Sequence, residues 1–420
     1  MRPAHKALDI ILKDLPAMGT ERVQLLDAAG RVLAEPIASS RTLPPRDCSA
    51  MDGYAVRAAD LAGASKESPA TLKVVGEVLA GMLPERAVGQ GEAVRITTGA
   101  PVPEGADAVV IQENTERESE TALRVFSAEV AGANIRRAGE DVKPGEGVLE
   151  PGCVLGPRQL GLLALLGRSV VQVRRRPRVA ILSSGDELVG IDGDTEGWKT
   201  VDSNAYTAAA QVVEAGGEPM LLPLVPDDKE AIVAALRSAA GADVLVSTAG
   251  VSVGPHDFVK PALEELGYEQ KFWKIRQRPG APLAFGYWDH RPVFGLPGNP
   301  VSAAVSFEVY VRPALKTMLG HQCLFRPVVE ARLRGEVRTR SSHTFFLRAL
   351  LSRGADGQWE VSSSGLQSSG AVKPLAQGNA LIVVPEGRET PVDGEPVRVL
   401  VLDPEALELD AAGARRFLGA

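Results

Sequence analysis

The stretch from Arg178 to Leu319 alternates short apolar segments with helical patterns, and this alternation constrains the fold more than any other feature of the chain. The apolar segments have the length of strands, and the segments between them place apolar residues at helical spacing. Strands that alternate with helices in this way build a largely parallel sheet with helices on both faces. We therefore predict a doubly wound α/β domain. Its expected strands are residues 178–182, 218–224, 244–247 and 292–295, and its expected helices are residues 203–215, 229–240, 261–266 and 301–319.

The segments on either side of this stretch indicate further domains. At about 150 residues per domain, a chain of 420 residues suggests about three. Residues 46–140 contain short apolar runs separated by Gly and Pro, which predicts a β-rich unit. The last ~95 residues are again β-rich and carry a hairpin signal at Asp356-Gly357, which predicts a compact all-β domain. Met1 to Leu15 form an amphipathic pattern, and we expect the helix at 158–166 to pack against this N-terminal helix.

Charge and composition exclude several classes of protein. Lys and Arg total 46 and Asp and Glu total 53, so the net charge is −7, which argues against nucleic acid as a partner. The longest apolar stretch, 160–173, is interrupted by Arg168 and is too short to cross a membrane. No signal peptide is recognisable, and the three widely spaced cysteines suggest neither disulfides nor zinc. We therefore expect a cytoplasmic protein with no membrane partner.

The loops that follow the predicted strands carry the candidate ligand-binding residues. In an open α/β sheet such loops converge at the carboxyl edge, where ligands bind. Gly, Ser and Asn in these loops expose backbone N–H groups that can hold phosphate oxygens. These candidate cofactor-binding residues are Ser184, Gly185, Gly250, Ser252, Gly254, Pro297, Gly298 and Asn299.

Carboxylates in the same loops point to a divalent cation. Glu187, Asp228 and Asp257 would repel a phosphate by themselves. Mg²⁺ removes this conflict because it binds carboxylates and phosphate oxygens together, so these three acids are the predicted metal ligands. The basic segment from Lys274 to Arg278 could contact phosphate directly.

Turn-forming runs around Asp52, Thr98 and Asp141 are structural turns on spacing alone. Together with the α/β segments, however, they form an ordered set of motifs that resembles the molybdopterin molybdotransferase family of molybdenum cofactor biosynthesis, which is similar to the E domain of gephyrin. The resemblance covers nearly the whole chain. The motifs are SAMDGYAV (49–56), TTGAPVPEGAD (97–107), GEDVKPGE (139–146), RRPRVAILSSGDELV (175–189), DSNAY (202–206), GVSVG (250–254) followed by Asp257, and FGLPGNPVSAAVSFEVYVRPAL (294–315).

This resemblance implies a multidomain α/β protein with four parts. They are a discontinuous helical N-terminal domain (1–40 and 142–172), an inserted β-rich domain (41–141), the doubly wound molybdopterin-binding α/β domain (173–323) and a C-terminal β-barrel-like domain (324–405). It also implies a homodimer, in which the inserted domain of one subunit faces the α/β crevice of the other. Upstream proteins of the same pathway are then further expected partners.

The resemblance also implies an activity, the insertion of molybdate into adenylylated molybdopterin with Mg²⁺-assisted release of AMP. Asp52, Thr98 and Asp141 would then join Glu187, Asp228 and Asp257 as catalytic residues. Lys274 and Arg278 would stabilise charge on the phosphoanhydride that is cleaved. Arg348 and Ser369 would reach the site from the C-terminal domain.

Two alternatives remain at this point, a molybdopterin adenylyltransferase and a gephyrin-like scaffold protein. The first shares the α/β domain but does not need the flanking domains, and retention of the six acidic and hydroxyl positions argues against the second. The chain also departs from the family pattern. Ala281 stands where a Lys is common, so one cation is missing, and we consider Arg276 a substitute.

Overall fold

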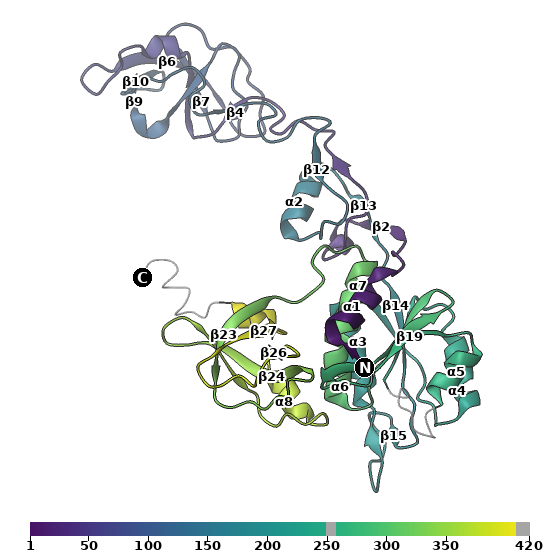
Figure 1. The fold of residues 1–420 in the computed structure, drawn as a ribbon. Coiled ribbons are helices and arrows are strands. Elements are labelled where there is room, and N and C mark those ends of the chain that lie inside the picture. Colours follow the sequence, from purple (N-terminus) through teal and green to yellow (C-terminus); the bar gives the residue numbers. More distant parts are fainter. Residues whose placement is uncertain (249–257, 409–420) are drawn as a thin grey trace. The chain divides into compact units, whose positions relative to one another are not determined.

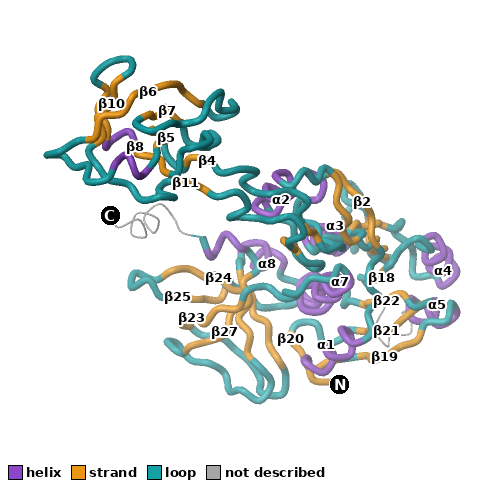
Figure 2. The backbone as a smooth tube through the Cα atoms, turned by 90° about the horizontal axis from the view of Figure 1, so that it is seen from above, coloured by secondary structure: helices purple, strands orange, loops and turns teal. Residues whose placement is uncertain are grey.

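The computed structural model describes residues 1–248 and 258–408, which form two compact units. Unit 1 comprises Met1–Ala34, Gly152–Gly156 and Val170–Ala420, and unit 2 comprises Glu35–Pro151 and Pro157–Ser169. Figure 1 and Figure 2 show the elements of both units. Among the described helices, none has the length and apolar character needed to cross a membrane.

The centre of unit 1 is a six-stranded sheet in the order β17-β14-β18-β22-β21-β19. The first four strands are parallel, while β21 is antiparallel to both β22 and β19. The predicted largely parallel sheet is thus confirmed, with an antiparallel edge. The strands are β14 (Arg178–Leu182), β17 (Glu218–Leu221), β18 (Val244–Ser247), β19 (Glu269–Trp273), β21 (Ala284–Trp288) and β22 (Arg291–Gly295).

Helices cover both faces of this sheet because successive strand residues point to opposite sides. Val179 and Ile181 belong to one core, whereas Ala180 and Leu182 belong to the other. The first core is closed by α1 (Ala4–Lys13), α3 (Ser203–Glu214), α6 (Pro300–Ser306), the π-helix η4 (Phe307–Val311) and α7 (Arg312–Met318), and the second by α4 (Lys229–Ser238) and α5 (Val259–Glu265).

The expected helical N-terminal domain is not confirmed. Ala7 and Ile11 of α1 are fully buried in the core of the α/β domain, so the amphipathic helix uses its apolar face there. The helix α2 (Pro157–Leu165) instead belongs to unit 2. Much of the remaining backbone forms strand pairs, β2 (Thr20–Gln24) with β13 (Val170–Arg174) and β3 (Ile37–Ala38) with β12 (Gly147–Leu149).

The C-terminal part of unit 1 is a closed five-stranded barrel, as expected. Its strands pair in the cycle β24-β25-β23-β27-β26 and back to β24. The predicted hairpin at Asp356-Gly357 joins β24 to β25. The strand β20 (Ile275–Arg278) runs beside both β24 and β1 (Arg2–Pro3), which links the α/β domain to the barrel. The barrel elements are β23 (Val328–Arg334), β24 (Thr344–Arg353), β25 (Trp359–Ser363), α8 (Val372–Gln377), β26 (Ala380–Val384), β27 (Pro396–Val401) and η5 (Pro404–Leu407).

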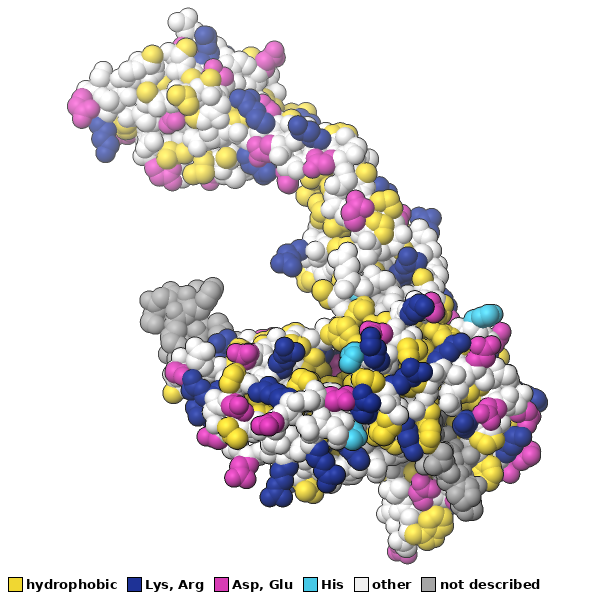
Figure 3. All heavy atoms as spheres, viewed as in Figure 1, with side chains coloured by type: hydrophobic (Ala, Val, Ile, Leu, Met, Phe, Trp, Pro, Cys, Tyr) yellow, Lys and Arg dark blue, Asp and Glu magenta, His cyan; other side chains and the backbone are white. Residues whose placement is uncertain are grey.

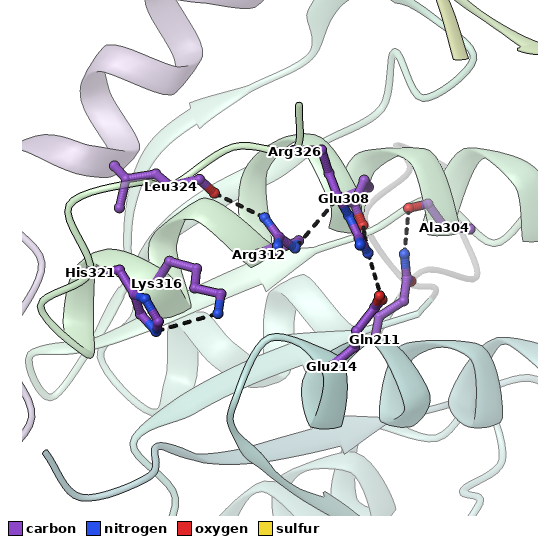
Figure 4. A network of polar contacts seen from close by, with 9 residues as sticks. All are labelled: Gln211, Glu214, Ala304, Glu308, Arg312, Lys316, His321, Leu324 and Arg326. Atoms are coloured by element: carbon purple, nitrogen blue, oxygen red, sulfur yellow. Dashed lines mark hydrogen bonds and ion pairs between the residues drawn. The ribbon is translucent and has the colours of Figure 1, made fainter. Parts of the chain in front are cut away.

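A buried charge network fixes the segment that leads from α7 into the barrel (Figure 4). The Arg326 guanidinium donates to Glu308 Oε1 at 2.8 Å and to Glu214 Oε2 at 2.6 Å. Arg312 approaches the same Glu308 carboxylate at 3.5 Å and donates to the Leu324 carbonyl. Because Glu308 lies in the π-helix and Glu214 in α3, these contacts tie three segments together. Removing one partner of such a buried pair is strongly destabilising.

Two further titratable groups lie at the end of α7 and belong to the same area (Figure 4). Lys316 Nζ and His321 Nε2 are 3.3 Å apart. Burial, and then the charges of Arg312 and Arg326, lower the pKa of Lys316 to about 8. Burial and the Lys316 charge lower the pKa of His321 to about 4, so its ring is neutral at pH 7 and can accept a hydrogen bond from the lysine.

Unit 2 contains the predicted β-rich unit, a six-stranded sheet in the order β8-β5-β7-β6-β10-β9. Gly53 permits a close strand approach, since a Cβ atom there would lie 1.9 Å from the Val110 carbonyl oxygen. Two small apolar cores lie on the faces of this sheet. The strands are β5 (Gly53–Val56), β6 (Ala70–Val78), β7 (Glu92–Ile96), β8 (Ala108–Ile111), β9 (Thr115–Arg117) and β10 (Ala122–Val125), with a separate pair formed by β4 (Cys48–Ser49) and β11 (Ile135–Arg136).

Candidate functional site

The loops after the parallel strands of unit 1 meet at the carboxyl edge of the sheet. The Ser183 hydroxyl after β14 lies 2.8 Å from the Thr248 hydroxyl after β18, and both residues are buried. Asn204, at the start of α3, donates from Nδ2 to the Gly298 carbonyl at 2.7 Å. The predicted convergence of these loops is therefore confirmed for the described residues.

Carboxylates gather at this edge around Asp227, a residue that the sequence analysis missed. The Asp227 N–H donates to Asp186 Oδ1 at 3.2 Å, and the Ser184 hydroxyl donates to the Asp227 carboxylate. Burial, and then the negative charges of Glu187 and Asp186, raise the pKa of Asp227. Like charges held together in this way favour a bound cation, and carboxylate oxygens are ligands that Mg²⁺ prefers.

The neighbouring Asp228, which was the predicted ligand, caps a helix. Its Oδ1 accepts a hydrogen bond from the Ala231 N–H at 2.8 Å, which pairs one of the backbone N–H groups that the first turn of α4 leaves without a partner inside the helix. In an Asp-Asp pair before a helix, the second residue can cap the helix while the first faces the loop. The sequence contains this Asp-Asp pair, but residue type alone does not tell which of the two acids caps the helix.

Four predicted site residues, Gly250, Ser252, Gly254 and Asp257, lie outside the described residues. Glu187 is described, and its exposed carboxylate folds over Gly185, where an added Cβ would meet Glu187 Oε2 at 2.6 Å. No group of three His, Cys, Asp or Glu side chains arranged to hold a metal ion occurs within residues 1–248 and 258–408. The metal role of Glu187, Asp228 and Asp257 therefore stays a prediction.

A cavity of about 340 Å³ lies where the α/β domain meets the barrel. Its lining comes from the end of β20 and the loop after it, the start of α6, β24 and the 367–369 loop. Five residues that the sequence analysis assigned to cofactor binding line it together: Arg278, Pro297, Asn299, Arg348 and Ser369. Gly298 is not in the lining, although it joins this loop to Asn204.

Arg348 is the buried cation of this cavity, with a relative exposure of 1%. Its Nη2 donates to the carbonyls of Leu366 at 2.6 Å and Ser368 at 3.0 Å, and its own N–H donates to the Gln367 side chain. These bonds hold the loop that carries Ser369. Among the described residues, Nε of Arg348 has no hydrogen-bond partner. Burial lowers the pKa of Arg348, because it opposes the charged form.

A buried polar chain orients the opposite wall. The Tyr310 hydroxyl, from the π-helix, donates to Gln277 Oε1 at 2.7 Å, and Gln277 Nε2 donates to the Pro279 carbonyl at 2.8 Å. Gly280 follows with φ +99°, and an added Cβ would lie 2.4 Å from Ser306 Oγ. The loop beside Arg278 is thus fixed against α6 and η4.

Two other cations of the basic segment lie outside the cavity. Lys274 follows β19 at φ +64°, and its Nζ lies 3.9 Å from the centre of the Trp273 ring. Arg276 Nε lies 2.7 Å from Glu386 Oε1. Because Arg276 is paired with Glu386 and does not line the cavity, the expectation that it replaces the missing lysine at position 281 is wrong.

In unit 2, Asp52 and Thr98 form a fixed pair. The Thr98 N–H and hydroxyl both donate to Asp52 Oδ1, at 2.7 and 2.9 Å. The N–H bond, and then the hydroxyl bond, lower the pKa of Asp52, so this exposed acid stays ionised. Thr98 therefore fixes the position of the Asp52 carboxylate. Asp141 is exposed and lies at a bend of the same unit, where its N–H donates a hydrogen bond to the Leu43 carbonyl.

Comparison with known proteins matches all three regions of the chain. Residues 2–167 match the MoeA N-terminal region (domain I and II), residues 180–317 a probable molybdopterin binding domain, and residues 330–402 the MoeA C-terminal region (domain IV). The chain is 37% identical to the molybdopterin molybdenumtransferase of Bacillus subtilis over 92% of its length and 90% of the relative's. It is also 37% identical to the molybdopterin molybdenumtransferase of Haemophilus influenzae, over 95% of this chain and 98% of the relative's.

Solved structures agree with these sequence matches. The crystal structure of the molybdopterin biosynthesis MoeA protein from Pyrococcus horikoshii OT3 matches with a TM-score of 0.83 and 32% identity, over 96% of this chain and 100% of that one. Family regions, full-length relatives and fold therefore all agree, and the chain belongs to the MoeA family of molybdopterin molybdenumtransferases.

Proposed function

We propose that this enzyme inserts molybdate into adenylylated molybdopterin and releases AMP. The observation that carries the proposal is the cavity between α6 and the barrel, where the buried Arg348 keeps an unpaired Nε and Arg278 lies at the rim. Cationic donors in a site with little water stabilise phosphate and oxyanion groups strongly. Asn299 and Ser369 add polar groups to the same lining.

The carboxylate loops would hold Mg²⁺ next to these anions. Glu187 and Asp227 supply ligand oxygens, with Asp228 and Asp257 as the further predicted ligands. The neighbours of Asp227 support this fit, because the negative charges of Glu187 and Asp186 act on its partly buried carboxylate and a cation would neutralise them. When bound, Mg²⁺ would neutralise charge on the phosphoanhydride. The residues of the chain orient the reacting groups: Ser184 holds Asp227, and Asn204 holds the 297–299 loop.

The direct test combines purified protein, adenylylated molybdopterin, Mg²⁺ and molybdate. We expect AMP release that depends on molybdate, together with reconstitution of an apo-molybdoenzyme by the product. Parallel reactions without molybdate and without Mg²⁺ are the controls. AMP release that is independent of molybdate, or none at all, would contradict the proposal. The matches over residues 2–167 and 330–402 favour this activity over adenylyl transfer, which needs the α/β domain alone.

Asp227→Asn tests the cation site through stability. The folded state raises the Asp227 pKa, so ionisation of Asp227 lowers the stability of the folded protein at a pH above that pKa. This loss of stability becomes smaller as the pH falls toward the ordinary pKa of 3.8. We expect the variant to melt at a higher temperature than the parent at pH 7 without Mg²⁺, with a difference that becomes smaller as the pH falls toward 3.8. Added Mg²⁺ should raise the melting temperature of the parent and not of the variant.

The matched control is Asp192→Asn, which removes an exposed acid from the loop after β15 (Leu188–Val189). It should leave both the melting temperature and its Mg²⁺ response unchanged. An Asp227→Asn protein that keeps the full Mg²⁺ response would remove Asp227 from the proposed ligands.

We further propose that the enzyme is a homodimer in which Asp52, with Thr98 and Asp141, acts on the substrate bound by the other subunit. The fixed, ionised Asp52 suits a catalytic or ligand-positioning role. Asp52→Ala and Glu187→Ala homodimers should each be inactive. A verified heterodimer of the two variants should recover about half the sites of the parent, measured as AMP release, since one of its two sites is intact. No recovery would contradict sharing of the site between subunits.

A further inference from the structure

Arg338 is a lining residue of the same cavity that neither the motifs nor the family resemblance indicated. It lies between β23 and β24 of the barrel and is exposed. Within the described part of the chain it makes no hydrogen bond or ion pair. Bonds on either side fix its segment: the Gly335 N–H donates to Asp393 Oδ1 at 2.6 Å, and the Thr339 hydroxyl lies 2.9 Å from that of Thr390.

The charges of the lining do not balance. Among the described residues, Arg278, Arg338 and Arg348 line the cavity, and no Asp or Glu does. Figure 3 shows Lys and Arg side chains mixed with Asp and Glu side chains over the visible face of unit 1, so three arginines without a carboxylate stand out. The positive charges of such a lining attract an anion that enters the cavity. Phe345 and Phe346 in the lining lower the local polarity and strengthen the attraction.

The three arginines are not equivalent. Arg348 uses Nη2 on two backbone carbonyls, and among the described residues its Nε has no partner and stays available to a ligand. Arg278 is held on the α/β side by its strand β20. Ala281 on the same side lines the cavity but carries no charge. Among the described lining residues on the barrel side, Arg338 is the guanidinium whose donors are all free of protein partners.

We propose that Arg338 is a direct ligand of the tetrahedral oxyanion in this cavity and determines its affinity. The inference rests on the proposed function and deepens it. The oxyanion is either free molybdate or a phosphate of the adenylylated pterin, and steady-state kinetics with each substrate varied in turn distinguishes the two. Loss of a hydrogen bond between a guanidinium and an oxyanion should raise KM by at least about tenfold.

The experiment compares Arg338→Ala with Arg340→Ala and with the double variant Arg338→Ala, Ala281→Lys. Arg340 is exposed on the same segment but does not line the cavity, so it is the matched control. We expect Arg338→Ala to raise one KM about tenfold with kcat within twofold. A higher molybdate KM identifies molybdate as the ligand, and a higher pterin KM identifies phosphate. Lysine at position 281, which returns a cation to the same lining, should restore the affinity.

Direct binding separates this inference from the proposed function. Calorimetric titration of molybdate, and separately of inorganic phosphate, into each purified protein does not require turnover. Weaker oxyanion binding by Arg338→Ala, with normal binding by Arg340→Ala, supports the inference even where the parent releases no AMP and the proposed function fails. Equal oxyanion binding and equal KM values in Arg338→Ala and Arg340→Ala would overturn the inference about Arg338. If, in addition, Arg348 variants lose AMP release, the proposed function still stands.

Discussion

Arg348→Met is expected to lower kcat/KM by at least about 100-fold, which corresponds to about 2.7 kcal/mol of lost transition-state stabilisation. Methionine fills most of the volume of the arginine, so the packing of β24 is largely kept. It removes the buried positive charge of the cavity and the two bonds to the carbonyls of Leu366 and Ser368. The measurement is AMP release at varied molybdate concentrations, with far-UV circular dichroism to show that the barrel is folded.

Part of this effect is structural, and a second variant separates the two contributions. The unpaired carbonyls cost about 1–3 kcal/mol each, so Arg348→Met should also melt at a lower temperature. Arg348→Lys keeps the charge but has no planar guanidinium fork, and it should restore part of the oxyanion affinity. Arg353→Met, on the exposed end of the same strand, is the control and should be near normal. A folded Arg348→Met enzyme with parental kcat/KM would show that the cavity does not bind substrate.

The α/β domain could be predicted from the sequence because its pattern is local. Val179 and Ile181 alternate with Ala180 and Leu182 in a run that is buried on both faces, and such runs are typical of central parallel strands. The loops after these strands then had to meet at one edge, so Ser184, Gly185 and Asn299 could be placed there before any contact was known.

The N-terminal helix shows where local pattern is insufficient. Ala7 and Ile11 predict that α1 has an apolar face, but they do not identify the surface that covers it. In the structure that surface is the α/β core, and so the helical domain was not found. The buried Arg326 illustrates the same limit, because its partners Glu308 and Glu214 lie 18 and 112 residues away in the sequence.

The cavity residues fall between these two cases. Arg278, Arg348 and Ser369 were placed through the family resemblance, and the structure brings them together. Arg338 could not be found in this way, since the turn before β24 carries no motif. Asp227 and Asp228 were indistinguishable by residue type, and only the hydrogen bond to the Ala231 N–H assigns Asp228 to the helix cap.

Glu187→Gln is expected to abolish molybdate-dependent AMP release, with a loss of at least about 100-fold in kcat. The substitution keeps the size of the side chain and its approach to Gly185, but it removes the negative charge that would bind Mg²⁺. Because Glu187 is exposed, the melting temperature without Mg²⁺ should change little. Glu196→Gln in the same loop region, also exposed, is the control and should keep full activity.

The combination of Glu187→Gln with Asp227→Asn shows whether the two acids serve one ion. Residues that hold the same ligand give non-additive losses, since the first substitution already removes most of the affinity. We therefore expect the double variant to bind Mg²⁺ no more weakly than Glu187→Gln alone, as measured by calorimetry. Additive losses in Mg²⁺ affinity would mean that the two carboxylates act independently. Near-normal turnover of Glu187→Gln, with Mg²⁺ affinity unchanged, would exclude the carboxyl edge as the cation site and leave the arginine-lined cavity as the part of the proposal still supported.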